Sequence, residues 1–257
     1  MPEYHEYLKL DELLSIQNLA SDEHDEMLFV IIHQSYELWF KQILHEVGYL
    51  QELLAADDLT RAGHTMKRVL TILKMLVAKI DILETMSPLE FLSFRERLES
   101  GSGFQSRQFR ELEFVLGYKR RAPIDNFPEG SSSRATLQKR FDEPTLWDSF
   151  LRFLAGRDFA VPGSLLARDV TLPVEASPEL QRVLIDVYRK DPAVASFCER
   201  LVDFDEGLQE WRYRHVKMVE RTIGTKQGTG GSTGTEYLRT TLLRPIFPDL
   251  WAIRSEF

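Results

Sequence analysis

The sequence predicts an all-α fold, a helical bundle with long antiparallel helices. Three long stretches carry apolar residues at steps of three and four, the spacing of one face of an α-helix, at about 25–54, 59–86 and 192–223. No stretch has a convincing strand pattern, and no period of about 20 to 50 residues repeats. With 257 residues, 43% of them apolar, the chain can bury a full-sized core, so we expect a single domain at 1–257.

The first long helix is expected to follow an aromatic leader and a polar link. A short helix is expected at 11–16, after the leader at 4–7. The apolar run at 27–32 could be a buried strand by composition, but the apolar spacing continues to Leu54, so its length favours a helix. The stretch at 59–86 should pack against this helix as an antiparallel neighbour.

Shorter helices are expected next, and then a connector. Ser87 and Pro88 are a good helix start, because proline at the first helical position needs no N–H partner. They open a helix at 89–98, and another is expected at 105–116. The chain at 118–134 is basic and then rich in Pro, Gly and Ser, which predicts a surface connector.

Helical patterns return in the second half of the chain. They lie at 145–154, at 178–189, from Asp191 to Gly224, and at 236–243. Ser177 is placed to cap the second of these helices, and Pro192 lies in the first turn of the third.

Charge and composition exclude several classes of partner. Lys plus Arg number 32 against 40 Asp plus Glu, a net charge of -8, so neither nucleic acid nor an anionic membrane surface is expected to bind. The sequence shows no signal peptide and no apolar run of the roughly 20 residues that span a bilayer, which favours a cytoplasmic protein. Cys198 is the only cysteine, so any haem would be held without a covalent thioether link.

Two of the six histidines fall on strongly apolar helix faces. His33 shares its face with Phe29, Glu37 and Phe40, and His215 lies deep in the third long helix, on its apolar face. Each could be a core histidine with an ordinary hydrogen-bond partner. Two such imidazoles on different helices of a bundle also suggest a metal centre.

The spacing of acidic residues and histidines narrows the kind of metal centre. No histidine has a glutamate three positions before it, so a carboxylate-bridged di-iron site is disfavoured. The spacing does not supply three or four nearby zinc ligands either. Haem fits better, because one neutral histidine suffices as the axial ligand and the other contacts can be apolar.

A second feature that could carry chemistry is Arg95, which has Phe91 one turn before it and Phe94 beside it. A guanidinium between rings binds a carboxylate well, because two parallel charge-assisted hydrogen bonds form in a dry setting. It could equally be a surface arginine whose stem packs on a phenylalanine.

A third feature is the glycine-rich segment GTGGSTG at 228–234. It lacks the lysine of a phosphate-binding loop and follows no strand. Its backbone N–H groups and the Thr229 hydroxyl could contact an anionic or amino-acid head group, but a flexible connector would have the same composition.

Taken together, these stretches resemble the tryptophan 2,3-dioxygenases, haem enzymes that open the indole ring of L-tryptophan. The resemblance rests on five blocks in the family order and covers most of the chain outside 117–168. The blocks are YxxYLxLDxLL at 4–14, DEMLFVIIHQSYELWFKQILHE at 25–46, FLSFRERL with SGFQSRQFR at 91–110, WRYRHVKMV at 211–219, and GTGGSTG at 228–234.

The resemblance implies a role for each matching residue. His215 would be the proximal ligand of the iron, and His33 the distal histidine beside the indole N–H. Substrate contacts are implied for four further residues: Phe29 and Phe91 at the indole ring, Arg95 at the carboxylate, and Thr229 at the ammonium and carboxylate end. Ser102 would be a haem-binding residue, near the haem edge and the distal pocket. Tyr4, Tyr7 and Leu8 of the leader would complete the pocket of a neighbouring subunit in a homotetramer.

The resemblance also implies the reaction. Ferrous, non-covalently bound haem b would bind O2, and both oxygen atoms would enter across the indole C2–C3 bond to give N-formylkynurenine, the first step of the kynurenine pathway of tryptophan catabolism. Two other activities stay open: a haem monooxygenase of the same fold acting on another indole, and a haem or O2 sensor without turnover. Whether His33 acts as a base or as a positioning group is also open.

Overall fold

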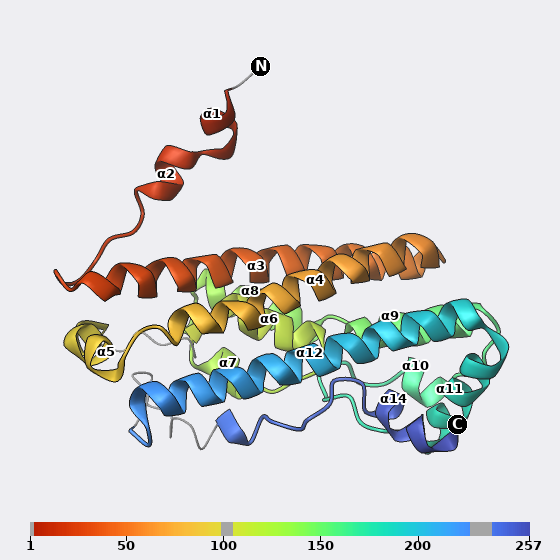
Figure 1. The fold of residues 1–257 in the computed structure, drawn as a ribbon. Coiled ribbons are helices and arrows are strands. Elements are labelled where there is room, and N and C mark those ends of the chain that lie inside the picture. The colour runs from red at the N-terminus through yellow and green to blue at the C-terminus, as the bar shows by residue number, and fades with distance from the viewer. Residues whose placement is uncertain (1–2, 99–104, 227–237) are drawn as a thin grey trace.

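The computed structural model describes residues 3–98, 105–226 and 238–257, and it is all-α throughout these residues. Figure 1 shows three long helices lying side by side, with shorter helices packed around them. The long helices are α3 (His24–Ala55), α4 (Leu59–Leu83) and α12 (Pro192–Ile223). The predicted fold class is therefore confirmed.

The α4 helix packs between the other two long helices. Arg68 bonds Glu46 at 2.8 Å and the Tyr36 hydroxyl donates to the Leu76 carbonyl at 2.7 Å, so α3 and α4 run antiparallel, as expected. On the other side, the α12 helix runs parallel to α4, because its residues Arg200 and Gly207 meet Gly63 and Leu73 in the same order along both helices.

Local sequence signals set where most helices begin. The Asp58 side chain accepts a hydrogen bond from the Arg61 N–H at the start of α4, and the Asp191 side chain accepts from two N–H groups at the start of α12. Ser87 forms a capping box with Glu90 in α5 (Pro88–Arg95), which begins where the sequence predicts a helix start.

The other helices cover the long ones. After α5 come the 3₁₀ turn η1 (Glu96–Leu98), α6 (Arg107–Val115), α7 (Ala122–Asp125), α8 (Ser132–Asp142), α9 (Leu146–Gly156), α10 (Gly163–Leu166) and α11 (Pro178–Lys190), and after α12 come α14 (Pro248–Ala252) and the 3₁₀ turn η3 (Ile253–Glu256). The sequence did not predict α7, α8, α10, α14 or η3. The helix expected at 236–243 lies partly outside the described residues, and turns occupy 240–243.

The segment expected to be a surface connector, 118–134, differs from that expectation. It contains α7 and the beginning of α8, and Ile124 is fully buried in a small cluster with Phe114, Leu137 and Phe141. The apolar residues of this cluster lie on three separate short helices, so no single stretch of sequence shows a sustained apolar period. For this reason the sequence did not predict α7 or α8. Whether 1–257 forms one folding unit stays a prediction.

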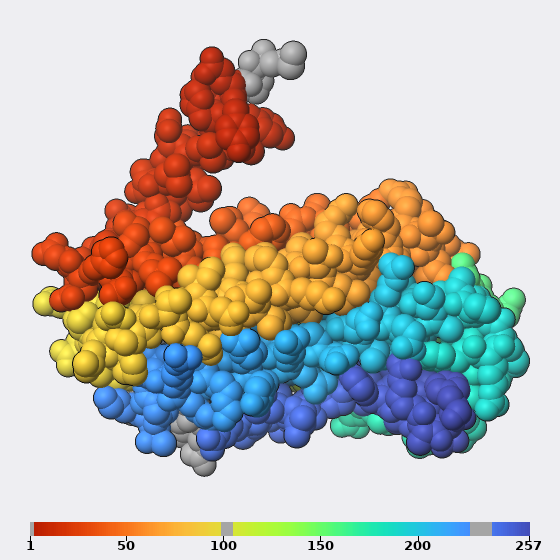
Figure 2. Space-filling view, viewed as in Figure 1, coloured from red at the N-terminus to blue at the C-terminus, as the bar shows by residue number. Residues whose placement is uncertain are grey.

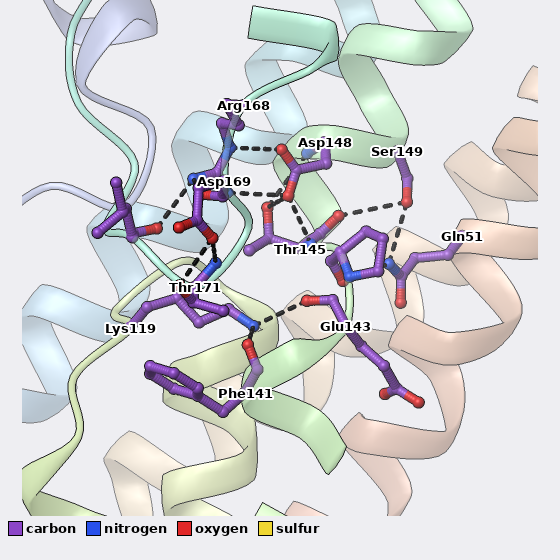
Figure 3. A network of polar contacts seen from close by, with 12 residues as sticks. Gln51, Lys119, Phe141, Glu143, Thr145, Asp148, Ser149, Arg168, Asp169 and Thr171 are labelled. Atoms are coloured by element: carbon purple, nitrogen blue, oxygen red, sulfur yellow. Dashed lines mark hydrogen bonds and ion pairs between the residues drawn. The ribbon is translucent and has the colours of Figure 1, made fainter. Parts of the chain in front are cut away.

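A buried ammonium group holds this region together (Figure 3). Lys119 is buried, and its Nζ donates to three carbonyl oxygens, those of Arg140, Phe141 and Glu143, each at 2.8 Å. These carbonyls lie at the C-terminal end of α8, where the helix has no further N–H groups to bond them. Burial lowers the pKa of Lys119 to about 8 against the opposing effect of Asp148, so the group is an ammonium at neutral pH.

The N-terminal segment stands apart from the rest of the molecule (Figures 1 and 2). It contains two short helices, α1 (Tyr4–Leu8) and α2 (Leu10–Leu14), and it projects away from the long helices as an arm. We call residues 3–21 the N-terminal arm. The sequence predicted α2 to within a few residues, at 11–16, but not α1. None of the helices in the described ranges is both long enough and apolar enough to cross a membrane.

Replacing Lys119 with Met should destabilise the fold, because three carbonyls at the end of α8 lose their charged donor. We expect the free energy of unfolding to fall by at least about 2 kcal/mol, which is the order of the cost of leaving a buried polar group without a partner. The measurement is the urea midpoint at fixed protein concentration. The control is Lys139→Met. Lys139 is an exposed lysine on α8, and its replacement should change the free energy of unfolding by less than about 0.5 kcal/mol. Equal shifts for both variants would refute the assignment.

Candidate active site

One end of the bundle brings together two histidines from helices that are far apart in the sequence. His33 lies in α3 and His215 lies in α12, and both are partly buried. They are close enough for the charge of one to affect the other, because His33 contributes to lowering the pKa of His215. The structure therefore places the two candidate histidines in one region.

The protonation of His33 follows from its hydrogen bond. Its Nδ1 lies 2.7 Å from the Phe29 carbonyl oxygen, which can only accept, so Nδ1 carries the proton. Burial lowers the pKa of His33, and the bond to Phe29 and the nearby Glu37 carboxylate oppose that effect. A neutral ring protonated at Nδ1 leaves the Nε2 lone pair free to accept a hydrogen bond or a proton.

His215 is also held neutral, by a different set of neighbours. Desolvation, assisted by His33, lowers its pKa to about 4. Its ring stacks on Trp211 with 5.4 Å between centroids and 12° between planes. In the part of the chain that the structure describes, we find no hydrogen-bond partner for the His215 ring. A neutral imidazole with an available lone pair is the form that a metal ion binds.

Aromatic rings surround both histidines. The centroid of the Phe29 ring lies 4.1 Å from that of the His33 ring. It lies 5.8 Å from the centroid of Phe91 and 5.6 Å from that of Phe94. The α5 helix supplies the last two rings, so α3 and α5 together form an apolar wall beside His33. Phe29 and Phe91, both expected at this wall, are brought together here.

A second aromatic group packs around Trp211, beneath His215. Phe109 of α6 lies 5.2 Å from Trp211, and Phe40 of α3 lies 6.3 Å from it. The ring of Phe40, which was expected on the face of His33, contacts Trp211. Phe109 was not among the predicted site residues. It stands in the SGFQSRQFR block, and that block was the signal that could have drawn attention to it.

The remaining candidate residues divide into three groups. Arg95 is the last residue of α5, one turn after Phe91, and is partly buried. Ser102 and Thr229 lie outside the described residues. Tyr4, Tyr7 and Leu8 lie on the N-terminal arm, with 75%, 73% and 41% of their surfaces exposed. The structure therefore places Arg95 on the helix that carries Phe91 and does not bring the three arm residues to the site of their own chain.

The donor set of this region fits a haem. Haem needs one neutral axial imidazole and otherwise apolar contacts, and the two neutral histidines with their aromatic rings supply both. The described residues contain no cluster of three His, Cys, Asp or Glu side chains that could hold a metal ion.

Sequence comparison gives a consistent family assignment. The profile of the family described as Tryptophan 2,3-dioxygenase matches residues 2–141 and 176–257. The chain is 59% identical to the tryptophan 2,3-dioxygenase of Herpetosiphon aurantiacus over 98% of this chain and 97% of the relative. It is 56% identical to that of an Anaeromyxobacter species, and 43% to that of Caulobacter vibrioides, again over 98% of this chain and at least 95% of each relative. This protein belongs to the tryptophan 2,3-dioxygenase family.

Proposed function

We propose that this protein is a cytoplasmic, haem-dependent dioxygenase that converts L-tryptophan and O2 to N-formylkynurenine. The observation that carries the proposal is the pair of neutral imidazoles, His33 on α3 and His215 on α12, in a chain of this family. In the reaction the indole C2–C3 bond breaks, and one oxygen atom of O2 ends on each of the two carbons. No outside reductant is consumed, because both oxygen atoms enter the product.

We assign the haem to His215. This residue would hold the iron of haem b through its free lone pair, without a covalent link, because the lone Cys198 is buried and cannot form a CxxCH attachment. In its reduced form the haem supplies the binding and activation of O2. The stacked Trp211 ring limits rotation of the imidazole, and the surrounding rings exclude water.

The chain would orient the substrate through three groups. His33 presents a free Nε2 that can accept a hydrogen bond from the indole N–H. Phe29 and Phe91, whose ring centroids lie 5.8 Å apart, form an apolar wall against which the indole ring would lie. Arg95, one turn beyond Phe91, would bind the substrate carboxylate, and Thr229 and Ser102 would act at the polar end and near the haem edge. Holding the ring and the carboxylate at two ends fixes the indole relative to O2.

We further propose a homotetramer in which the N-terminal arm enters the pocket of a neighbouring subunit. The support comes from exposed apolar side chains. Tyr4 and Tyr7 are about three-quarters exposed, and Leu14 is 72% exposed. The outward face of α3 adds Met27, Ile31 and Leu38, which lie on one side of the helix and are also exposed. Apolar surface of this extent is typical of a contact between subunits.

The activity is tested by incubating reduced, haem-loaded protein with L-tryptophan and ¹⁸O2. We expect N-formylkynurenine, seen by its near-ultraviolet absorbance and by a mass that includes both labelled atoms. A product with one labelled atom would show a monooxygenase, and O2 binding without any product would show a sensor. Either result would overturn the proposal.

The two histidines should differ when each is replaced by Ala. His215→Ala should lose haem, because the only proposed iron ligand is gone, and added imidazole should restore some of it. His33→Ala should keep haem and lose activity roughly 2- to 13-fold, the equivalent of one hydrogen bond of about 0.5 to 1.5 kcal/mol. Haem content is measured from the Soret band and iron analysis. Loss of haem from His33→Ala alone would exchange the two roles.

Replacing Arg95 with Met should lower kcat/KM for L-tryptophan by at least about 10-fold, because a charged hydrogen-bonded contact is worth roughly 1.5 to 3 kcal/mol. Activity on tryptamine, which has no carboxylate, should change little. The matched control is Arg97→Met, an exposed arginine in the following 3₁₀ turn. Equal losses on tryptophan and tryptamine would show that Arg95 supports the fold or the haem.

A further inference from the structure

The base of the N-terminal arm is held to α3 by a buried carboxylate. Glu26, in the first turn of α3, is only 2% exposed. Its Oε1 accepts a hydrogen bond from the Ala20 N–H at 2.8 Å. Its Oε2 accepts one from the Ser21 N–H at 2.8 Å and another from the Ser21 hydroxyl. One side chain therefore fixes two consecutive residues of the arm.

This arrangement does more than cap the helix. In a capping box, the acidic residue at the third helical position bonds the N–H of the N-cap residue. Here the N-cap is Glu23, and Glu26 reaches past it to Ala20 and Ser21. Burial disfavours the charged carboxylate, but the three hydrogen bonds outweigh that effect and lower the pKa of Glu26, so the group is ionised at neutral pH. The bonds set the direction in which the chain leaves α3.

A second contact holds the arm further out. The Gln17 side chain donates to the Gln34 side chain at 2.7 Å and to the Leu13 carbonyl at 2.9 Å. Gln34 lies two turns along α3 from Glu26, on the surface of the helix. The arm is thus attached to its own chain at two polar points, near residues 17 and 20–21.

Unlike the polar groups at its base, the apolar side chains of the arm are largely exposed. Tyr4, Tyr7, Leu14 and Ile16 are all more than half exposed, and the arm points away from the long helices (Figure 2). Polar bonds therefore fix its base, while its apolar surface stays available. An arm with a fixed base and an exposed apolar surface is placed to bind another molecule. In the proposed tetramer that molecule is a second copy of this chain.

We propose that Glu26 is a positioning residue for the substrate pocket of the neighbouring subunit. It acts by holding the base of the arm in the direction from which Tyr4 and Tyr7 reach that pocket. The inference rests on the proposed exchange of arms between subunits. It predicts that Glu26 affects tryptophan binding in a chain other than its own, whereas a residue that only stabilises α3 would act within its own chain.

The test uses tetramers assembled from two kinds of full-length subunit, co-expressed with different affinity tags and purified on both. The receiving subunit carries Tyr4→Ala, Tyr7→Ala and Leu8→Ala, so its pocket is intact but its arm is not. The donating subunit carries Arg95→Met, so its arm is intact but its pocket cannot hold the carboxylate. The activity of the mixed tetramer then comes from pockets of the receiving subunit that are completed by an arm of the donating subunit.

Glu26→Gln is the substitution to introduce, because it keeps the shape of the side chain and turns an NH2 group toward N–H donors. In the donating subunit it should raise KM for L-tryptophan by about 10-fold, because fewer arms are correctly placed, and should change kcat less than about 2-fold. In the receiving subunit it should have no effect. Gln17→Ala in the donor should act in the same sense, and Glu23→Gln, an exposed glutamate one turn away, should not.

The outcomes separate the inference from the proposals beneath it. An equal effect of Glu26→Gln in both kinds of subunit, or a fall in kcat with KM unchanged, would show that Glu26 serves only its own chain and would overturn the inference. Inactive mixed tetramers from an active wild type would overturn the exchange of arms, and the inference with it. A wild-type protein that makes no N-formylkynurenine would overturn the proposed activity instead.

Discussion

The packing of α4 between α3 and α12 is the constraint on which the rest of the structure depends. The α12 helix approaches α4 so closely that a Cβ on Gly207 would lie 2.9 Å from Leu73 Cδ2, closer than two such carbons can pack. Any side chain at Gly207 would push the helices apart or displace Leu73. Because His33 is carried by α3 and His215 by α12, the packing of both helices against α4 fixes the relation between the two imidazoles.

The long helices could be predicted because each carries its own signal. The spacing of apolar residues and the helix starts at Ser87 and Asp191 are local features, and the structure confirms the helices that they predict. The α8 helix escaped detection because only Leu137 and Phe141 are buried on it. Part of what stabilises it is an ammonium 21 residues or more away in the chain, on Lys119, and no local pattern reports such a contact.

Some residues of the candidate site could likewise be predicted from local sequence features, and others could not. His33 and His215 could be singled out because a histidine on an apolar helix face is visible in the sequence alone, and Arg95 because two phenylalanines flank it. The ring of Phe109 beside Trp211, and the bonds of Glu26 to the arm, depend on which helices meet and on the path of the chain before α3. Only the pattern of Ser21 followed by an acidic residue in the first turn of α3 could have suggested Glu26.

The distance along the chain between α3 and α12 also determines when the protein can become complete during synthesis. At about 5–20 residues per second, α12 leaves the ribosome roughly 10 to 30 s after α3. During that interval α3 and α4 can pair, but the side of α4 that α12 will cover, including Leu73, is still exposed to water. The growing chain therefore carries an uncovered apolar face and only one of the two imidazoles of the site, His33, and it has no paired site to offer a ligand until nearly the whole chain has been made.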